Sequence, residues 1–191
     1  MRAAATLGAP MRAEIVGWGM CAPRQVVTNA DLALRVETSD EWIRTRTGIE
    51  RRHIAGPHDT TSTLAIEAAR RALQVADADP REIDLIIVGT ATPDYPLPST
   101  ACMVQDALGA AQAGAFDLNA GCSGFVYALA MGQRAIVSGA NKLVLVIGAD
   151  VLSRITNWAD RGTCVLFGDG AGAVLLRASA TQEGVLSTVL G

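Results

Sequence analysis

The stretch Asn119-Ala120-Gly121-Cys122-Ser123-Gly124-Phe125 decides how this sequence is organised. It follows a short strand-like run at 114–118 and opens a segment reaching to Gly139 that we expect to be helical. Cys122 would then lie on a tight turn from a strand into a helix, the arrangement known as a nucleophile elbow. The pattern therefore favours a reactive thiol presented at the edge of a sheet.

The position of Cys122 has a chemical consequence. A thiol at the first turn of a helix faces unpaired backbone N–H groups and the positive end of the helix dipole, and both favour the thiolate. The small neighbours Gly121, Ser123 and Gly124 would let another chain approach the sulfur, and the Cys122 N–H could stabilise an oxyanion. Alternatively, Cys122 is one more small buried apolar residue, as most free cysteines are. The local pattern leaves both readings open.

The composition favours an α/β fold. The 191 residues are 50% hydrophobic, but only 4% are aromatic and 19 are glycine, so the core must be built from small aliphatic side chains in closely spaced layers. A chain of this length can form one domain that buries about 70% of its unfolded surface. We therefore expect one α/β unit over 1–191.

Charge and cysteine usage narrow the function classes. The net charge is −3 and no lysine or arginine run is present, so we expect no nucleic-acid partner. Cys21, Cys102, Cys122 and Cys164 show neither C-x-x-C spacing nor the density of a disulfide scaffold, which fits a reducing cytoplasm. The first ten residues lack a signal-peptide core, and Met11 could equally be the start. No uncharged apolar run approaches the roughly 20 residues of a membrane span.

The rest of the chain alternates between strands and helices. The run 83–89 is apolar on both faces, which is typical of a parallel strand covered on both sides. An amphipathic helix at 61–76 places Leu64, Ala68, Ala72 and Val75 on its apolar face. A polar, charged insertion occupies 28–57. The predicted strands are 14–20, 83–89, 115–118, 143–147 and 172–176, and the predicted helices are 61–76, 99–108 and the elbow helix.

The elbow helix also predicts a further protein layer. Between Phe125 and Ser138 its only charged residue is Arg134, and apolar residues lie all round it, so it needs burial on every side. More of the same chain, or a partner, would supply that layer. Alternatively, its alanines, glycines and serines make the face merely small.

Two other motifs admit a functional interpretation. The run Gly168-Asp169-Gly170-Ala171-Gly172 lacks a following G-K-[ST] and precedes a predicted strand, so we expect a tight bend or close backbone packing there, and no phosphate cradle. The insertion combines Trp42 with several arginines, Arg44 and Arg46 among them, which suits base stacking and phosphate pairing. The alternative is a solvated loop with a docked tryptophan.

Three separated segments carry a family resemblance. They are T-S-D-E-W-I-R-T-R-T-G-I at 38–49, N-A-G-C-S-G-F at the elbow, and D-R-G-T-C-V-L-F-G-D-G-A-G-A from Asp160. In this order they resemble the N-terminal half of a β-ketoacyl-acyl-carrier-protein synthase III, with the likeness running from about Ile15 to the end. The resemblance implies a thiolase-like homodimer of chains built from two similar α/β halves. This chain would be one βαβαβαββ half, with a mostly parallel five-stranded sheet covered by helices on both faces.

The resemblance also implies the chemistry. In this family the cysteine that matches Cys122 takes an acyl group from acyl-CoA. A carbanion made by decarboxylating malonyl-acyl-carrier protein then attacks the thioester, which gives a 3-oxoacyl product and starts fatty-acid synthesis. The resemblance implies acyl-CoA as a substrate, no permanently bound cofactor and no metal.

Further positions carry over from the resemblance one by one. Trp42 and Arg161 match the pair that sandwiches the CoA adenine. Thr38 matches a nearby hydrogen-bonding hydroxyl, and Arg46 a basic residue of the CoA site. Leu97 matches a residue that lines the acyl pocket of the partner subunit. Leu97 alone leaves the length of the primer undecided.

The sequence departs from the family in one respect. The catalytic histidine and asparagine of these enzymes lie in the C-terminal half, whereas this sequence ends at Gly191. His53 and His58 match no catalytic position and are expected at the surface. We therefore expect the isolated chain to carry the nucleophile but to be inactive in condensation. The alternatives are a non-catalytic dimerising or CoA-binding fragment and a starter synthase of polyketide or secondary metabolism. A hydrolase is disfavoured because no histidine follows Cys122.

Overall fold

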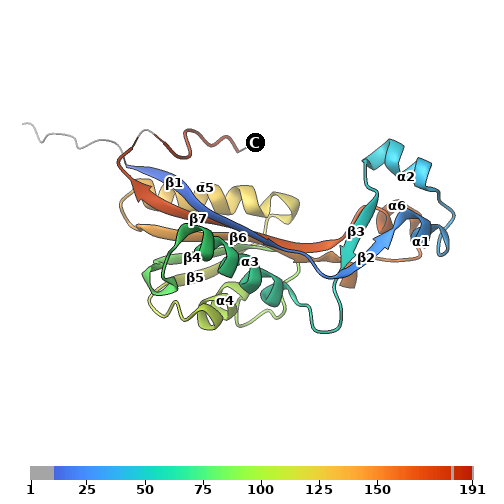
Figure 1. Cartoon of the computed structure of the whole chain (residues 1–191), viewed down its shortest axis with the longest axis horizontal. Coiled ribbons are helices and arrows are strands. Elements are labelled where there is room, and N and C mark those ends of the chain that lie inside the picture. Colours follow the sequence, from blue (N-terminus) through green and yellow to red (C-terminus); the bar gives the residue numbers. More distant parts are fainter. Residues whose placement is uncertain (1–10, 182, 191) are drawn as a thin grey trace, which may run out of the picture.

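The computed structural model describes residues 11–181 and 183–190. Within them the chain forms a twisted five-stranded sheet with helices on both faces and a two-stranded sheet at one end (Figure 1). The larger sheet and its helices consist of β1 (Arg12–Cys21), α3 (Thr61–Ala76), β4 (Leu85–Gly89), α4 (Thr100–Leu108), β5 (Gly114–Leu118), α5 (Gly124–Val137), β6 (Leu143–Val151) and β7 (Asp169–Ser179).

The sheet has the strand order β1-β7-β6-β4-β5. β4 pairs in parallel with both β5 and β6, whereas β7 pairs antiparallel with both β6 and β1. Four strands therefore run in one direction and β7 runs in the other, which confirms the predicted mostly parallel α/β sheet. Because β4, β5 and β6 are parallel, the residues that follow them meet at one edge of the sheet.

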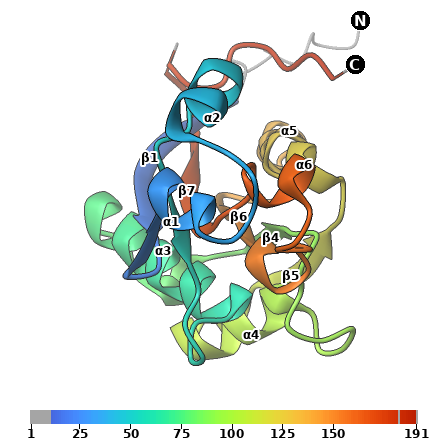
Figure 2. The same ribbon diagram turned by 90° about the vertical axis from the view of Figure 1, so that its right-hand side faces the viewer.

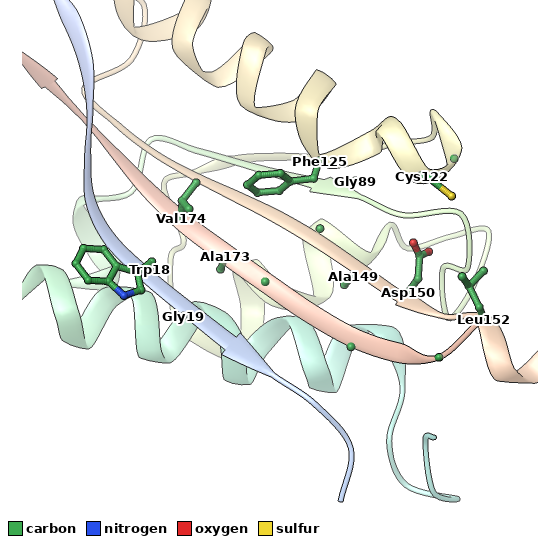
Figure 3. Close-up of a pocket in the computed structure, with 15 residues that line it drawn as sticks. Trp18, Gly19, Gly89, Cys122, Phe125, Ala149, Asp150, Leu152, Ala173 and Val174 are labelled. Carbon is green, nitrogen blue, oxygen red and sulfur yellow. The ribbon is translucent and has the colours of Figure 1, made fainter. Parts of the chain in front are cut away.

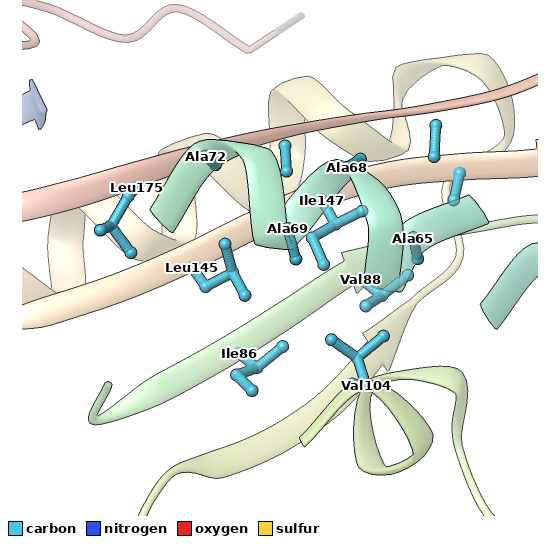
Figure 4. Close-up of a cluster of buried hydrophobic side chains, with 14 of the residues drawn as sticks. Ala65, Ala68, Ala69, Ala72, Ile86, Val88, Val104, Leu145, Ile147 and Leu175 are labelled. Atoms are coloured by element: carbon cyan, nitrogen blue, oxygen red, sulfur yellow. The ribbon is translucent and has the colours of Figure 1, made fainter. Parts of the chain in front are cut away.

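One face of the sheet is covered by α3 and α4. A stripe of alanines on α3 packs against aliphatic residues of the sheet, including Leu145 and Ile147 (Figure 4). The close approach requires glycine on β1, because a Cβ at Gly17 would stand 2.2 Å from the carbonyl oxygen of Ala72. The predicted bounds of α3 are confirmed, but Val75 is 49% exposed and does not belong to the apolar face, whereas the next residue, Ala76, still packs against the core.

The other face of the sheet carries α5. Gly132 lets this helix pack closely, because a Cβ there would meet the side chains of Val146, Leu176 and Val144 at 3.0 to 3.2 Å. The outward side of α5 exposes Val126, Met131 and Val137. The apolar residues all round this helix are thus half covered by the sheet. Nothing among residues 11–181 and 183–190 covers the other half.

The insertion is folded rather than a solvated loop. It consists of β2 (Gln25–Thr28), α1 (Asn29–Ala33), α2 (Asp40–Thr47) and β3 (Arg51–Ile54), and it packs against α6 (Arg161–Cys164). Its core is a separate hydrophobic cluster of Val27, Leu32, Ile43, Cys164 and Val165. Figure 2 shows α1, α2 and α6 gathered at this end of the molecule. The insertion begins at Gln25, earlier than predicted, because β2 pairs with β3.

The glycine-rich run is the largest correction to the predicted elements. We expected it to precede a strand starting at Gly172, but Asp169 is already the first residue of β7. The expected close packing holds at Gly168, where a Cβ would meet the Cβ of Arg52 at 3.0 Å. The strand pairs antiparallel with neighbours on both sides, so backbone hydrogen bonds extend it through residues that lack large side chains.

Across the described part of the chain, the longest apolar helices fall short of what a bilayer crossing requires.

Candidate active site

Cys122 lies on a short 3₁₀ turn, Gly121–Ser123, directly between β5 and α5. Gly121 makes the turn possible, since its φ of +52° lies in the left-handed region that favours glycine. The Gly121 N–H donates to Oδ1 of Asn119 at 3.3 Å, which ties the turn to the end of β5. The Cys122 side chain is exposed, so the alternative of a buried structural cysteine is wrong.

The start of α5 is held against the sheet by close backbone contact. Gly124 is buried, and a Cβ on Gly89 at the end of β4 would stand 2.7 Å from the carbonyl carbon of Gly124. We expected Gly124 to leave room beside the sulfur. Instead it lets the helix rest on β4, and this contact fixes the height of Cys122 above the sheet.

Cys122 borders a groove of about 580 Å³ on the α5 face of the sheet (Figure 3). Asp150 and Leu152 lie at the same end as the sulfur, while Trp18 and Val174 line the other end. The lining consists largely of apolar side chains and of glycines, including those at 89, 148, 168, 170 and 172. The groove thus places a mostly apolar surface next to the thiol.

Asp150 is a residue of this groove that the sequence analysis missed. Its Oδ1 accepts hydrogen bonds from the Ala91 N–H at 2.8 Å and from the hydroxyls of Thr92 and Thr90 at 3.1 and 3.2 Å. Thr92 in turn accepts from the Val151 N–H at 2.8 Å. These bonds lock the loop after β4 onto the end of β6. A carboxylate near the carboxyl end of an apolar strand was the available signal.

The second group of predicted residues gathers around Trp42 on α2. The guanidinium carbon of Arg46 lies 4.5 Å from the centre of the Trp42 ring, and that of Arg161 lies 4.7 Å from it. Arg161 also donates to the carbonyl oxygen of Glu37 at 3.2 Å. The structure thus brings α6 and α2 together at the tryptophan, although they are more than 100 residues apart in sequence.

Thr38 lies beside this stack, between Glu37 and the N-cap of α2, Ser39. Its Oγ1 is buried and has no hydrogen-bond partner among the described residues. A buried hydroxyl without a partner costs free energy, so its presence at this position favours a group that binds there.

Neither histidine belongs to the groove of Cys122. Nδ1 of His53 lies 2.6 Å from the carbonyl oxygen of Pro23, and His58 is exposed near the start of α3. Leu97 is 85% exposed on the loop before α4 and likewise does not line that groove.

The other thiols differ from Cys122 in burial. Cys164 is fully buried, and desolvation raises its pKa, with a smaller contribution from Asp160. Burial likewise raises the pKa of Cys21. Cys102 is half-buried on α4. Cys122 is therefore the thiol most open to a reagent among these four.

Comparisons with known proteins agree with this arrangement. Residues 116–191 match the family model of 3-oxoacyl-[acyl-carrier-protein (ACP)] synthase III. A β-ketoacyl-[acyl-carrier-protein] synthase III of Xylella fastidiosa is 60% identical over 178 residues, which cover 93% of this chain and 55% of the relative. The chain thus spans about half the length of the curated relatives it matches.

Solved structures show the same fold. The crystal structure of 3-oxoacyl-[acyl-carrier-protein] synthase III from Aquifex aeolicus matches with a TM-score of 0.87 and 52% identity, covering 89% of this chain and 55% of that one. The priming β-ketosynthase of the R1128 polyketide pathway matches with a TM-score of 0.86 and 39% identity, covering 93% and 54%. The thiolase-like α/β prediction is confirmed.

Proposed function

We propose that this chain is a member of the β-ketoacyl-[acyl-carrier-protein] synthase III family and provides the acyl-accepting half of a condensing enzyme that initiates fatty-acid synthesis. The whole reaction would consist of acyl transfer from acyl-CoA to a cysteine, followed by decarboxylative condensation with malonyl-acyl-carrier protein. In this proposal 1–191 is the N-terminal half of the enzyme. Because the relatives are nearly twice as long, the activity is assigned to a protein of their length.

The observation that carries the proposal is the exposure of Cys122 on the turn between β5 and α5. Its sulfur would attack the thioester carbonyl of acyl-CoA. A new sulfur–carbon bond forms, the bond between the acyl carbon and the CoA sulfur breaks, and CoA leaves as a thiolate that takes up a proton. Backbone N–H groups at the start of α5 would stabilise the oxyanion formed on the way.

The stack around Trp42 supports a nucleotide site for the CoA. Arg161 now lies 4.7 Å from the centre of the Trp42 ring. Atoms in contact are about 3.5 Å apart, so an adenine inserted between the two groups needs a separation of about 7 Å. Arg161 would have to move away from Trp42 by about 2 Å, while Arg46 keeps its own contact with the Trp42 ring. The Thr38 hydroxyl is buried and has no partner among the described residues, so it would bind the nucleotide once a movement exposes it.

The condensation step needs groups beyond these residues. Decarboxylation of a malonyl thioester requires a donor for the developing enolate, and in this family a histidine and an asparagine of the second half serve there. Nδ1 of His53 is hydrogen-bonded to the carbonyl oxygen of Pro23, and His58 lies outside the groove of Cys122. We therefore place the condensation machinery in a second half that would also cover the exposed apolar residues of α5 and β1, such as Val126, Met131 and Trp18.

A second copy of the chain would complete the assembly as a homodimer. β5 is at the edge of the sheet and pairs only with β4 within the described ranges. The neighbouring loop exposes Tyr95 and Leu97. An open edge strand next to exposed apolar residues is a favourable place for strand pairing with another copy.

The proposed setting is the cytoplasm, where acyl-CoA and the carrier protein would be the partners. The four cysteines at positions 21, 102, 122 and 164 are free thiols, which fits a reducing compartment. The proposal includes no permanently bound cofactor, no metal, no nucleic acid and no membrane partner.

Two alternatives have a specific basis. The likeness to the priming β-ketosynthase supports a starter role in polyketide synthesis, which uses the same acyl transfer. The exposed apolar face of α5 supports a non-catalytic module that binds CoA or dimerises, should 1–191 function alone.

Incubation with labelled acetyl-CoA and longer acyl-CoAs, followed by peptide mass spectrometry, tests the proposal. We expect an acyl adduct on Cys122 that disappears in Cys122→Ser. Binding of CoA without any adduct would favour the non-catalytic module. The absence of both binding and adduct in the wild-type protein would refute the nucleophile and nucleotide assignments together.

A further inference from the structure

We infer that Arg52 is a positioning residue that holds the helices carrying Trp42 and Arg161 in place relative to each other, through a buried relay that joins them. The inference rests on the proposed nucleotide site. It adds that a buried residue which does not touch the nucleotide fixes the helices that form the site.

Arg52 lies on β3 and is only 5% exposed. Its Nη2 donates to the carbonyl oxygen of Val165 at 3.0 Å, and its Nη1 donates to Oδ1 of Asn29 at 3.0 Å and to the carbonyl oxygen of Val27 at 3.3 Å. Val165 is the C-cap of α6, the helix that begins with Arg161. One end of the guanidinium thus holds the helix that presents Arg161.

Asn29 continues the connection to α2. It is 1% exposed, and its Nδ2 donates to Oδ1 of Asp40 at 2.8 Å and to the carbonyl oxygen of Ile49 at 2.8 Å. Asp40 is the first residue of α2, and Ile49 follows directly after its C-cap, Gly48. The amide therefore holds both ends of the helix that carries Trp42.

The relay is buried at its centre and depends on the shape of a guanidinium. Only a planar group with several donors can bond acceptors on α6, β2 and α1 at once; a lysine ammonium would reach them poorly. All three acceptors of Arg52 are neutral, and its Nε has no partner among the described residues. Desolvation accordingly lowers the pKa of Arg52. None of the acceptors that Arg52 contacts is a carboxylate, so no ion pair explains the burial of its charge. We therefore attribute the burial of Arg52 to the elements that its hydrogen bonds join.

Removing Arg52 should therefore disturb the nucleotide site without disturbing the thiol. Cys122 is fixed by the contact between Gly89 and Gly124, and none of the groups in the relay takes part in that contact. Without these hydrogen bonds, α6 and α2 are no longer joined through Arg52 and Asn29. The positions of Arg161 and Trp42 relative to each other are then no longer fixed. We expect weaker CoA binding and an unchanged rate of Cys122 alkylation.

The test compares Arg52→Met, Arg52→Lys and Asn29→Ala with wild type by calorimetric titration of CoA and by iodoacetamide labelling of Cys122. The matched control is Arg177→Met, an exposed arginine in strand β7. We expect CoA affinity to fall about tenfold in Arg52→Met, to fall less in Arg52→Lys, and to match wild type in Arg177→Met. Cutting the relay at Asn29 while keeping Arg52 should give a similar loss.

Two outcomes separate the inference from the proposal on which it rests. Wild-type protein that fails to bind CoA overturns the nucleotide site itself, and the inference with it. Wild-type binding with equal affinity in Arg52→Met and Asn29→Ala overturns the relay alone. Labelling of the buried Cys164 reports local unfolding in Arg52→Met. In that case Asn29→Ala decides, and wild-type affinity in this variant counts against the relay.

Discussion

Replacing Gly89 by alanine should lower the stability of the protein by forcing the start of α5 away from β4. Gly89 ends β4, and its Cα faces the first residues of α5. A Cβ there would stand 2.7 Å from the carbonyl carbon of Gly124, 2.9 Å from its oxygen and 2.9 Å from the nitrogen of Phe125. All three are backbone atoms, so no side-chain rotation relieves the overlap. The helix or the strand must move.

The geometry gives the size of the effect. A non-bonded contact of about 3.5 Å is comfortable, so the start of α5 must retreat by about 0.8 Å from the nearest atom. Overpacking of this kind costs typically about 1–3 kcal/mol, partly offset by about 0.4–1 kcal/mol because alanine restricts the unfolded chain. A net loss of about 1.5 kcal/mol lowers Tm by about 3–6 °C in a protein of this size.

Thermal unfolding followed by circular dichroism provides the assay, with Gly172→Ala as the matched control. Gly172 lies in β7, and a Cβ there would meet no atom within 4 Å, so we expect its Tm to stay within about 1 °C of wild type or to rise slightly. Equal Tm values for wild type, Gly89→Ala and Gly172→Ala would refute the claim that contact between β4 and α5 fixes the elbow.

Three further predictions concern the thiols, the nucleotide site and one carboxylate. Iodoacetamide should modify Cys122 in the folded protein and reach the buried Cys164 only after denaturation, as peptide mass spectrometry can show. Trp42→Ala should weaken CoA binding by about 2 kcal/mol, or about thirtyfold, in calorimetry, because an adenine loses its stacking surface; unchanged affinity would place the nucleotide elsewhere. Hydrogen bonds from Arg81 lower the pKa of Asp79 from 3.8 to about 2. Because a lowered pKa stabilises the fold above the unfolded value, the small stability contribution of the Asp79 carboxylate relative to Asp79→Asn should be constant above about pH 5 and be lost as the pH falls through about 2.

Much of the fold could be predicted because the signals were local. The span of α3 follows from the 3.6-residue period of its apolar residues, and β4 from a run that is apolar on both faces. β7 was placed too late, since strand pairing rather than side-chain pattern extends it: Gly172 pairs with both β1 and β6, and Gly170 pairs with β6. The register that makes this possible depends on β6 and β1 residues at least 18 positions away in the sequence, which no short local window contains.

The candidate site divides in the same way. Cys122 was found because its motif is contiguous, and Trp42, Arg46 and Arg161 because the family resemblance named them. The structure places Arg46 and Arg161 against the Trp42 ring, whereas the roles of these residues in binding stay predictions. Asp150 was missed because its partners come from a different loop, and their proximity depends on the pairing of β4 with β6.

The small cluster around Val27, Leu32, Ile43 and Val165 is separate from the two clusters that flank the main sheet. In the proposed function, nucleotide binding would therefore depend on this small cluster, and acyl transfer on the clusters of the main sheet. Under that proposal, substitutions in the small cluster should change nucleotide affinity and leave the position of Cys122 unchanged. An engineer could exchange 25–54 together with the α6 segment as one cassette and leave the chemistry of the elbow in place.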